Sequence, residues 1–417
     1  MHTALDICQQ KDRPLAEVFT RQYRLSRDDP PEVDGWSRTS LHGWRLTHCP
    51  LLFTRAIDDE TGAQIGWLLG TPVEDATHAI GADPYRIAAT QDAPDFWDQA
   101  EHQITALAVA YAAIVLPAGA ARMYFDPIVN VPAVYDAKTR TVASSPLMAL
   151  SRPLRPNHRV HPNRITTEGG NYGMRQTCDA DVLRAMANHY LDLETFTQHR
   201  HWPSATESIV LPDQAMDQTA ELIVDRLGKI TGALLSHYTC NIAMSGGADS
   251  RTLIYSAKQH LHHVQHFYAH RTNKMTAVDC FIAHQLGEDL GHDVHLIDAW
   301  RTLPNDTVPP EKIAEVQWES MQKTGLMHAP LDNQVVATSL TPGADLCLRG
   351  NVMDMSKANQ WPADMGVSVA HGISKLVIGG RPEAQNAIYW DGEYRNWLST
   401  LPESALPRMY EFAFVEL

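Results

Sequence analysis

The sequence predicts an α/β protein in two parts: an α+β first half over residues 1–205, and a second half over residues 206–417 built on a parallel sheet with flanking helices. Three observations lead to this division. Strand-like and turn-like segments alternate in the first half, prolines and glycines interrupt the chain between about residues 153 and 203, and strands alternate with helices after residue 240. The length of the chain also favours two parts, because 417 residues exceed the roughly 250–300 that a single hydrophobic core accommodates.

The first half is expected to contain a hairpin, a helix and further strands. Strand-like residues 51–57 and 64–69 flank the turn-forming run Asp58-Asp59-Glu60-Thr61-Gly62, which is typical of a β-hairpin. We expect a helix from Asp95 to Val115, and an irregular chain in the stretch from Pro153 to Pro203. Further strands are predicted at residues 122–126, 133–135 and 141–145.

The second half is expected to begin with a long amphipathic helix, because apolar residues recur at steps of three and four. These residues are Met216, Ala220, Val224, Leu227, Ile230 and Leu234. Strands are predicted at residues 240–244, 264–269, 294–297 and 345–348, and helices between them include one that carries Val278, Phe281, Ile282, Leu286 and Leu290 and ends at Gly291. This alternation implies a parallel sheet, and the ligand of such a sheet binds beyond the carboxyl ends of its strands.

The composition argues against several classes of protein. The chain has 34 Lys plus Arg against 49 Asp plus Glu, a formal net charge of −15, whereas a nucleic-acid binder needs a basic face. The most apolar run, Ile104 to Val115, is about twelve residues long and too short to span a membrane. The N-terminus has no secretory-signal pattern, and the cysteines form no CxxC pair, so we expect reduced thiols in a cytoplasmic protein. The six cysteines are Cys8, Cys49, Cys178, Cys240, Cys280 and Cys347.

The run Ser245-Gly246-Gly247-Ala248-Asp249-Ser250 directly follows the first strand of the second half and begins a helix. Its two glycines bring backbone N–H groups close to a ligand, and the helix directs the positive end of its dipole to the same place. With the hydroxyl groups of Ser245 and Ser250, these features favour a pyrophosphate group. Asp249 is compatible with phosphates when a Mg²⁺ ion lies between them.

A strand followed by SGGxDS and a helix resembles the PP-loop (HUP-like) fold of ATP pyrophosphatases, and it lacks the lysine of a Walker motif. Within that superfamily the chain is similar to the asparagine synthetase family. The resemblance covers roughly residues 120–360 and is strongest at residues 240–298. Gly350-Asn351-Val352-Met353-Asp354 lies where the family has its GEGSDE segment. Residues 142–145 look like the end of the family's N-terminal Ntn-glutaminase domain, and residues 188–193 and 202–203 like its interdomain stretch.

The resemblance implies ATP and Mg²⁺ as cofactors and a set of site residues. Ser245, Gly246, Gly247, Asp249 and Ser250 would bind the β- and γ-phosphates. Asp249 and Asp354 would be the Mg²⁺ ligands. Gly350 would let adenine and ribose pack against the backbone, and residues 268–270 would form the opposite wall, with His270 next to the nucleotide.

Several departures from the family bear on the activity. The family's glutaminase needs a cysteine after the initiator Met, and this chain has His2, so we expect a degenerate glutaminase-like domain without glutamine hydrolysis. Cys8 would serve only after a cleavage that nothing in the sequence indicates. Asn351 stands where the family has a glutamate that steers the nucleophile. Arg251 replaces a small residue; it either reaches a phosphate or substrate carboxylate, or makes a surface ion pair.

Two further groups of residues are ambiguous. The family's lysine-bearing segment has no clear counterpart, and Lys357, Lys375 and Arg381 are the candidates. Five histidines crowd residues 260–270, but no cysteine or carboxylate completes a ligand set, so polar edge residues are expected rather than a zinc site. They are His260, His262, His263, His266 and His270.

The resulting hypothesis is an ATP-dependent amide-forming ligase that adenylates a small-molecule or peptide carboxylate and transfers the acyl group to ammonia or an amine. The alternative is a catalytically reduced, nucleotide-binding scaffold or regulatory subunit. Asn351 favours the alternative, and the presence of both Asp249 and Asp354 opposes it. A third function, tRNA thiolation, conflicts with the acidic charge and the absence of CxxC. A homodimer or a partner protein remains open.

Overall fold

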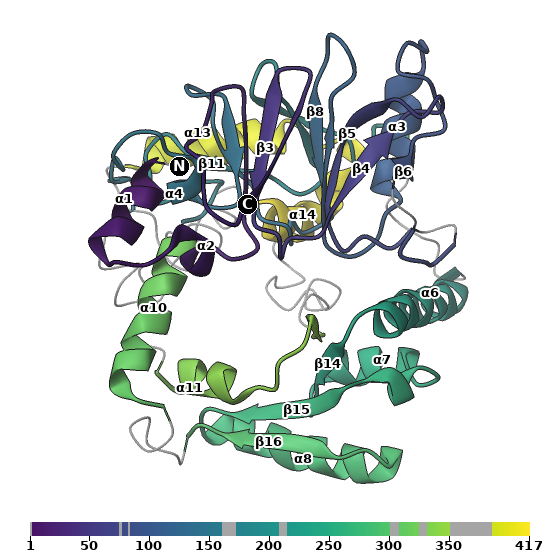
Figure 1. Cartoon of the computed structure of the whole chain (residues 1–417). Coiled ribbons are helices and arrows are strands. Elements are labelled where there is room, and N and C mark those ends of the chain that lie inside the picture. Colours follow the sequence, from purple (N-terminus) through teal and green to yellow (C-terminus); the bar gives the residue numbers. More distant parts are fainter. Residues whose placement is uncertain are drawn as a thin grey trace.

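The computed structural model describes residues 2–74, 77–81, 84–160, 172–207, 215–300, 308–324, 332–350 and 386–417. The described residues form a mixed α/β structure with three sheets (Figure 1). Two sheets belong to the first half of the chain, and the third, which is parallel, belongs to the second half. The coarse prediction of an α/β protein with a parallel sheet is therefore confirmed.

The two sheets of the first half pack face to face. A six-stranded antiparallel sheet has the order β11-β9-β10-β1-β3-β2, and a seven-stranded sheet has the order β13-β12-β8-β7-β5-β4-β6, in which the pair of β4 and β6 is parallel. The strands of the first sheet are β1 (Tyr23–Ser26), β2 (Ser37–Leu41), β3 (Trp44–His48), β9 (Val134–Asp136), β10 (Thr141–Ala143) and β11 (Leu183–Arg184). The strands of the second are β4 (Thr54–Asp58), β5 (Gln64–Gly70), β6 (Tyr85–Arg86), β7 (Tyr111–Val115), β8 (Arg122–Phe125), β12 (His189–Asp192) and β13 (Thr197–Arg200).

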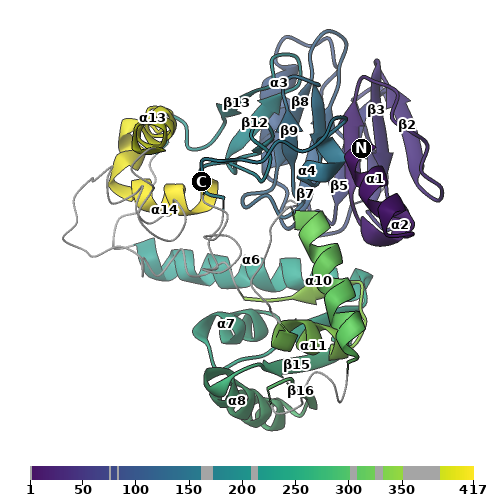
Figure 2. The same cartoon turned by 90° about the vertical axis from the view of Figure 1, so that its left-hand side faces the viewer.

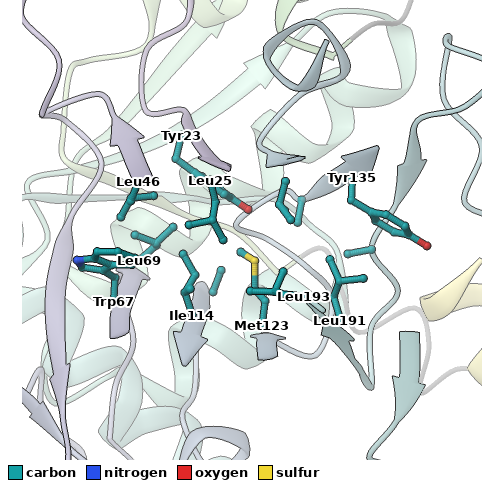
Figure 3. Close-up of a cluster of buried hydrophobic side chains, with 14 of the residues drawn as sticks. Tyr23, Leu25, Leu46, Trp67, Leu69, Ile114, Met123, Tyr135, Leu191 and Leu193 are labelled. Carbon is teal, nitrogen blue, oxygen red and sulfur yellow. The ribbon is translucent and has the colours of Figure 1, made fainter. Parts of the chain in front are cut away.

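The core between these sheets is made of side chains that alternate along each strand. Leu25 and Leu46 from the first sheet meet Ile114, Met123 and Leu191 from the second (Figure 3). Helices cover the outer faces: α3 (Phe96–Thr105) packs on the seven-stranded sheet, and the short α1 (His2–Gln10), α2 (Leu15–Val18) and α4 (Pro146–Ala149) pack on the six-stranded sheet. Burying alternate side chains against a facing sheet is the usual way in which such a pair of sheets is stabilised.

Two predictions for the first half are wrong. The helix expected from Asp95 to Val115 ends at Thr105, and Tyr111–Val115 forms the central strand β7, with every side chain buried. A short apolar run fits a buried strand as well as a buried helix, so its pattern could not separate the two. The stretch expected to be irregular contains β11, β12 and β13: β11 and β12 pair with the distant strands β9 and β8, and β13 pairs with β12.

The parallel sheet of the second half has the order β16-β15-β14-β17. Its strands are β14 (Cys240–Ala243), β15 (His266–Arg271), β16 (Val294–Asp298) and β17 (Leu346–Leu348). From β14 the chain adds β15 and β16 on one side and then returns to place β17 on the other, so the order reverses between β14 and β17. In open α/β sheets the ligand crevice lies at this kind of reversal.

Helices lie on both faces of this sheet. On one face, α6 (Met216–His237), α7 (Ala248–Ser256) and α8 (Lys274–Leu290) share a core with Ile242 and Phe267, and on the other, α10 (Pro310–Thr324) and α11 (Asp332–Leu340) share a core with Tyr268. Gly291 ends α8 with a left-handed φ of 70°, as the sequence predicts. The burial of α8 differs from its apolar pattern, because Cys280, Ala283 and Gly287 are buried and the side chain of Phe281 is 65% exposed.

Described contacts between the two halves of the chain include those made by α10 and by the last helices (Figure 2). On α10, Trp318 packs against the core below α1 and α4, and the Arg13 guanidinium bonds to the carboxylates of Glu315 and Glu319. The last helices, α13 (Ala387–Leu398) and α14 (Met409–Glu416), form a core with Met174 and Met186 of the first half. The assignment of all residues from 206 onward to one domain stays a prediction. No described helix has the length and apolar character needed to cross a membrane.

Candidate functional site

The glycine-rich turn after β14 and Gly350 after β17 meet at the carboxyl edge of the parallel sheet. A Cβ atom at Gly350 would lie 2.6 Å from the carbonyl carbon of Asp249 and 2.8 Å from the nitrogen of Ser250. No side chain fits at that distance from backbone, so only glycine permits this approach. The tertiary structure thus brings together two predicted segments that lie about a hundred residues apart.

The two serines of the turn bond chiefly to the turn itself. The oxygens Ser245 Oγ and Ser250 Oγ are 2.9 Å apart, and Ser250 Oγ lies 3.0 Å from the Ser245 carbonyl oxygen. The Gly247 amide donates to Ser245 Oγ at 3.2 Å. Since a hydroxyl has one hydrogen to donate, we expect these side chains to hold the turn in shape and the backbone to supply donors for a ligand.

The backbone of the turn continues into α7 without a side-chain cap. Gly247 is the N-cap residue and, because it has no side chain, it makes no side-chain cap. The first N–H groups of a helix have no acceptor within the helix, and the helix dipole makes this end attractive to anions. An anion placed here would therefore meet N–H donors directly.

Asp279 on α8 is a site residue that the sequence analysis did not identify. Its Oδ1 atom accepts a hydrogen bond from the Gly246 amide at 3.1 Å. A Cβ at Gly246 would lie 2.5 Å from Ile282 Cδ1, so the missing side chain lets the turn pack against α8. No local sequence pattern pairs Asp279 with the turn, because the contact depends on how α8 lies on the sheet.

A cavity of about 630 Å³ lies next to the turn, within the usual size range of small-ligand sites. Four acidic or basic side chains border it, those of Asp249, His270, Asp279 and Arg349. The other lining residues are Ala243, Met244, Ser245, Gly247, Ser250, Tyr268, Ala269, Thr272, Thr276, Ala337, Thr338 and Gly350. The wall expected from residues 268–270 is thus present in this cavity.

His270 is held in one tautomer at the edge of the cavity. The Thr341 hydroxyl donates to the Ala337 carbonyl oxygen at 2.8 Å, so its oxygen accepts from His270 Nε2, which lies 2.7 Å away. Burial lowers the pKa of His270, and the nearby Arg349 lowers it further. The imidazole is therefore neutral near pH 7, with Nδ1 available as an acceptor.

Arg349 borders the cavity, whereas Arg251 is exposed on α7, with its Nε atom 3.4 Å from the Gly247 carbonyl oxygen. Arg251 was the arginine that the sequence analysis considered for a phosphate or a substrate carboxylate. Arg349 carries the same charge, and its place between β17 and Gly350 is the signal that could have identified it.

Several predicted residues lie outside the described part of the chain: Asn351, Asp354, Lys357, Lys375 and Arg381. Among the residues that are described, no group of three or more His, Cys, Asp or Glu side chains has the geometry to hold a metal ion. Of the crowded histidines, His262 and His263 have ring centroids 4.0 Å apart, and His266 lies 4.8 Å from His295 on β16.

The six cysteines are free thiols, and four of them are buried. Burial raises the pKa of Cys8 to about 11, so the thiol is protonated and a poor nucleophile at neutral pH.

No protein-family model matches the sequence, and no curated protein matches it significantly.

Proposed function

We propose that this protein is an ATP-dependent amide-forming ligase of the asparagine synthetase type, with a PP-loop parallel sheet and a degenerate glutaminase-like first domain. The observation that carries the proposal is the meeting of the glycine-rich turn with Gly350 at the reversal of the strand order, beside a cavity of about 630 Å³. Strand-order reversals in open α/β sheets are sites of nucleotide binding.

The charges and donors at this edge fit the phosphates of ATP. The start of α7 offers N–H groups, and Arg349, directly after β17, adds a cation at the border of the cavity. Gly246 and Gly247 carry no side chain to keep phosphate oxygens away from the backbone. The neutral His270 and the wall at residues 268–270 would lie beside the base and ribose.

A divalent cation fits the carboxylates proposed to bind it. Mg²⁺ prefers oxygen ligands and keeps several of its waters, so one or two carboxylates plus phosphate oxygens suffice. Asp249 borders the cavity and would be one ligand, and Asp354, four residues after Gly350, would be the other. The ion would neutralise negative charge on the phosphates next to these carboxylates.

The proposed reaction has two steps. An oxygen of the substrate carboxylate attacks the α-phosphorus of ATP; the bond from that phosphorus to the bridging oxygen breaks, and pyrophosphate leaves as the acyl-adenylate forms. A nitrogen nucleophile then attacks the acyl carbon, loses a proton and displaces AMP to give the amide. In both steps the chain's residues act mainly by positioning the reactants and stabilising charge.

The nucleophile in this proposal is ammonia or an amine, because His2 stands where a glutaminase would need cysteine. The carboxylate belongs to a small molecule or a peptide, and the reaction takes place in the cytoplasm. A homodimer or a partner protein that supplies ammonia is compatible with the proposal.

The test is ATP–pyrophosphate exchange, measured with labelled pyrophosphate over a panel of carboxylic acids. We expect at least one acid to support exchange in the wild type, and the Asp249→Ala variant to lose it. Asp289→Ala is the matched control, because Asp289 is an exposed carboxylate on α8 that does not border the cavity.

Two outcomes would contradict the proposal. Exchange that persists in Asp249→Ala would show that the turn is not the nucleotide site. Binding of Mg-ATP without exchange for any acid would instead support the alternative, a nucleotide-binding scaffold or regulatory subunit, for which Asn351 in place of the family's glutamate is the supporting observation.

A further inference from the structure

A second cavity of about 640 Å³ lies in the first half of the chain, and the proposed ligase reaction does not use it. Its walls come from the six-stranded sheet, from residues 172–178, from the end of α14 and from Lys323 on α10. The lining residues are Gln22, Ile128, Val129, Pro132, Ala133, Val134, Ser144, Pro146, Tyr172, Gly173, Arg175, Gln176, Thr177, Cys178, Arg184, Ala185, Ala187, Lys323 and residues 414–417.

Gln22 presents an uncommitted donor at this cavity. Its side chain is only 7% exposed, and its Oε1 atom accepts a hydrogen bond from Ser145 Oγ at 2.7 Å. Within the described residues its Nε2 group donates to no acceptor, although the side chain borders the cavity. Nε2 is not one of the described buried polar atoms that lack a partner, so it reaches the solvent of the cavity, where a ligand oxygen could accept from it.

Lys323 brings a positive charge to the same region. Its Nζ atom donates to Thr20 Oγ1 at 3.2 Å, two residues before Gln22 in the chain. In the described part of the chain the one carboxylate that approaches it is that of Glu319, 3.9 Å away, and this carboxylate bonds to Arg13 at 2.8 Å. Lys323 therefore shares this carboxylate with Arg13, and burial lowers the pKa of the lysine.

The remaining charges of the cavity do not neutralise Lys323. Arg175 and Arg184 also border it; Arg175 pairs with Glu393 at 3.0 Å, and Arg184 donates to the carbonyl oxygens of Tyr172 and Leu417. The one acidic side chain of the lining, Glu416, bonds to Arg200 at 2.6 Å. Three basic side chains and one acidic side chain therefore border the cavity, in a chain whose net charge is −15. A cationic, partly enclosed cavity attracts anions.

We propose that this cavity binds a small organic carboxylate. Its carboxylate oxygens accept hydrogen bonds from Lys323 Nζ and Gln22 Nε2, and its carbon skeleton lies against apolar walls such as Val134, Pro146 and Phe414. These apolar walls favour an organic acid over inorganic phosphate, which has only polar surface. The proposal is independent of the proposed ATP chemistry, because it uses no residue of the other cavity.

The test is calorimetric titration of the full chain with a panel of small mono- and dicarboxylates, and with inorganic phosphate as a separate arm. We expect one or more carboxylates to bind, the Lys323→Met variant to weaken binding at least about tenfold, and Gln22→Met to weaken it about two- to tenfold. Lys312→Met is the matched control, because Lys312 lies on the same helix and pairs with Glu315 outside the cavity.

Hydrogen–deuterium exchange of the wild type gives an independent readout should a variant fail to fold. We expect the bound carboxylate to protect residues 172–178 and 414–417. Protection of residues 245–250 instead, phosphate binding as tight as any carboxylate, an equal loss in Lys312→Met, or no binding by any acid would each overturn the proposal.

Discussion

At the residue scale, two arginines near the glycine-rich turn have different surroundings. Arg349 borders the cavity, as do Asp249 and Asp279, whereas Arg251 does not border it and its Nε atom lies 3.4 Å from the Gly247 carbonyl oxygen. A guanidinium recognises phosphate through paired N–H donors, and it can do so only where the ligand binds. The two side chains therefore form a natural comparison.

We predict that Arg349→Ala raises the KM for ATP in pyrophosphate exchange about tenfold or more, since a hydrogen bond to a charged group contributes roughly 1.5–3 kcal/mol. Arg251→Ala should change it by less than about threefold. Both side chains are exposed, so neither variant should alter the urea midpoint of unfolding. An equal effect of the two substitutions would contradict the assignment of Arg349 to the nucleotide side of the cavity.

At the scale of single elements, the contacts of α6 and α8 depend more on small residues than on the periodic apolar residues from which these helices were predicted. The side chains of Met216 and Leu222 on α6 are about 60% exposed, while Gly228 and Gly232 are buried against α7 and the chain after it. On α8 the buried face includes Gly287, and Phe281 is exposed. Glycines let helix backbones approach closely, a property that apolar periodicity does not report.

We predict that Gly228→Ala destabilises the protein by about 1–3 kcal/mol. A Cβ at this position would lie 2.5 Å from the Ser256 carbonyl oxygen, so α6 and α7 would have to move apart. The matched control is Gly392→Ala on α13, where no atom lies within 4 Å of the added Cβ. Alanine is the better helix former, so this control should gain up to about 1 kcal/mol.

Urea unfolding of both variants measures the difference. If Gly228→Ala has the same free energy of unfolding as Gly392→Ala, α6 does not pack closely on α7 at Gly228.

At the scale of the whole molecule, the last helix docks on the first half through a buried polar cluster. The Glu416 carboxylate accepts hydrogen bonds from Asn188, Arg200 and Trp397. Beside this cluster lie His189 and His201, whose Nε2 atoms are buried and have no partner among the described residues. Burial, with Arg200 close by, lowers the pKa of His189 to about 3, and burial and His189 lower the pKa of His201 to about 4.

We predict that lowering the pH weakens the docking of the last helix at pH values above those at which most carboxylates become protonated. In the unfolded chain both histidines have the ordinary pKa of about 6.5, so they bind protons below that pH, whereas in the folded protein they stay neutral. The free energy of unfolding therefore falls as the pH drops from about 6.5 toward 4. Each histidine contributes a slope of about 1.4 kcal/mol per pH unit. His201→Gln should reduce the slope by that amount, and His199→Gln, at an exposed neighbour, should leave it unchanged.

Urea titrations at several pH values between 5 and 7.5 test this prediction. If the free energy of unfolding depends on pH equally steeply in the wild type and in His201→Gln, His201 is not buried as a neutral group.

The sequence by itself determined the parallel β-α alternation, the turn at residues 245–250 and the end of α8 at Gly291, because these depend on local periodicity and on glycine backbone freedom. The tertiary structure alone decided that Tyr111–Val115 is a strand, since its apolar run fits two kinds of buried element. It also decided that Asp279 and Arg349 join Asp249 at one cavity. Such contacts form between segments distant in the chain, and they depend on strand order and helix packing, which no local pattern encodes.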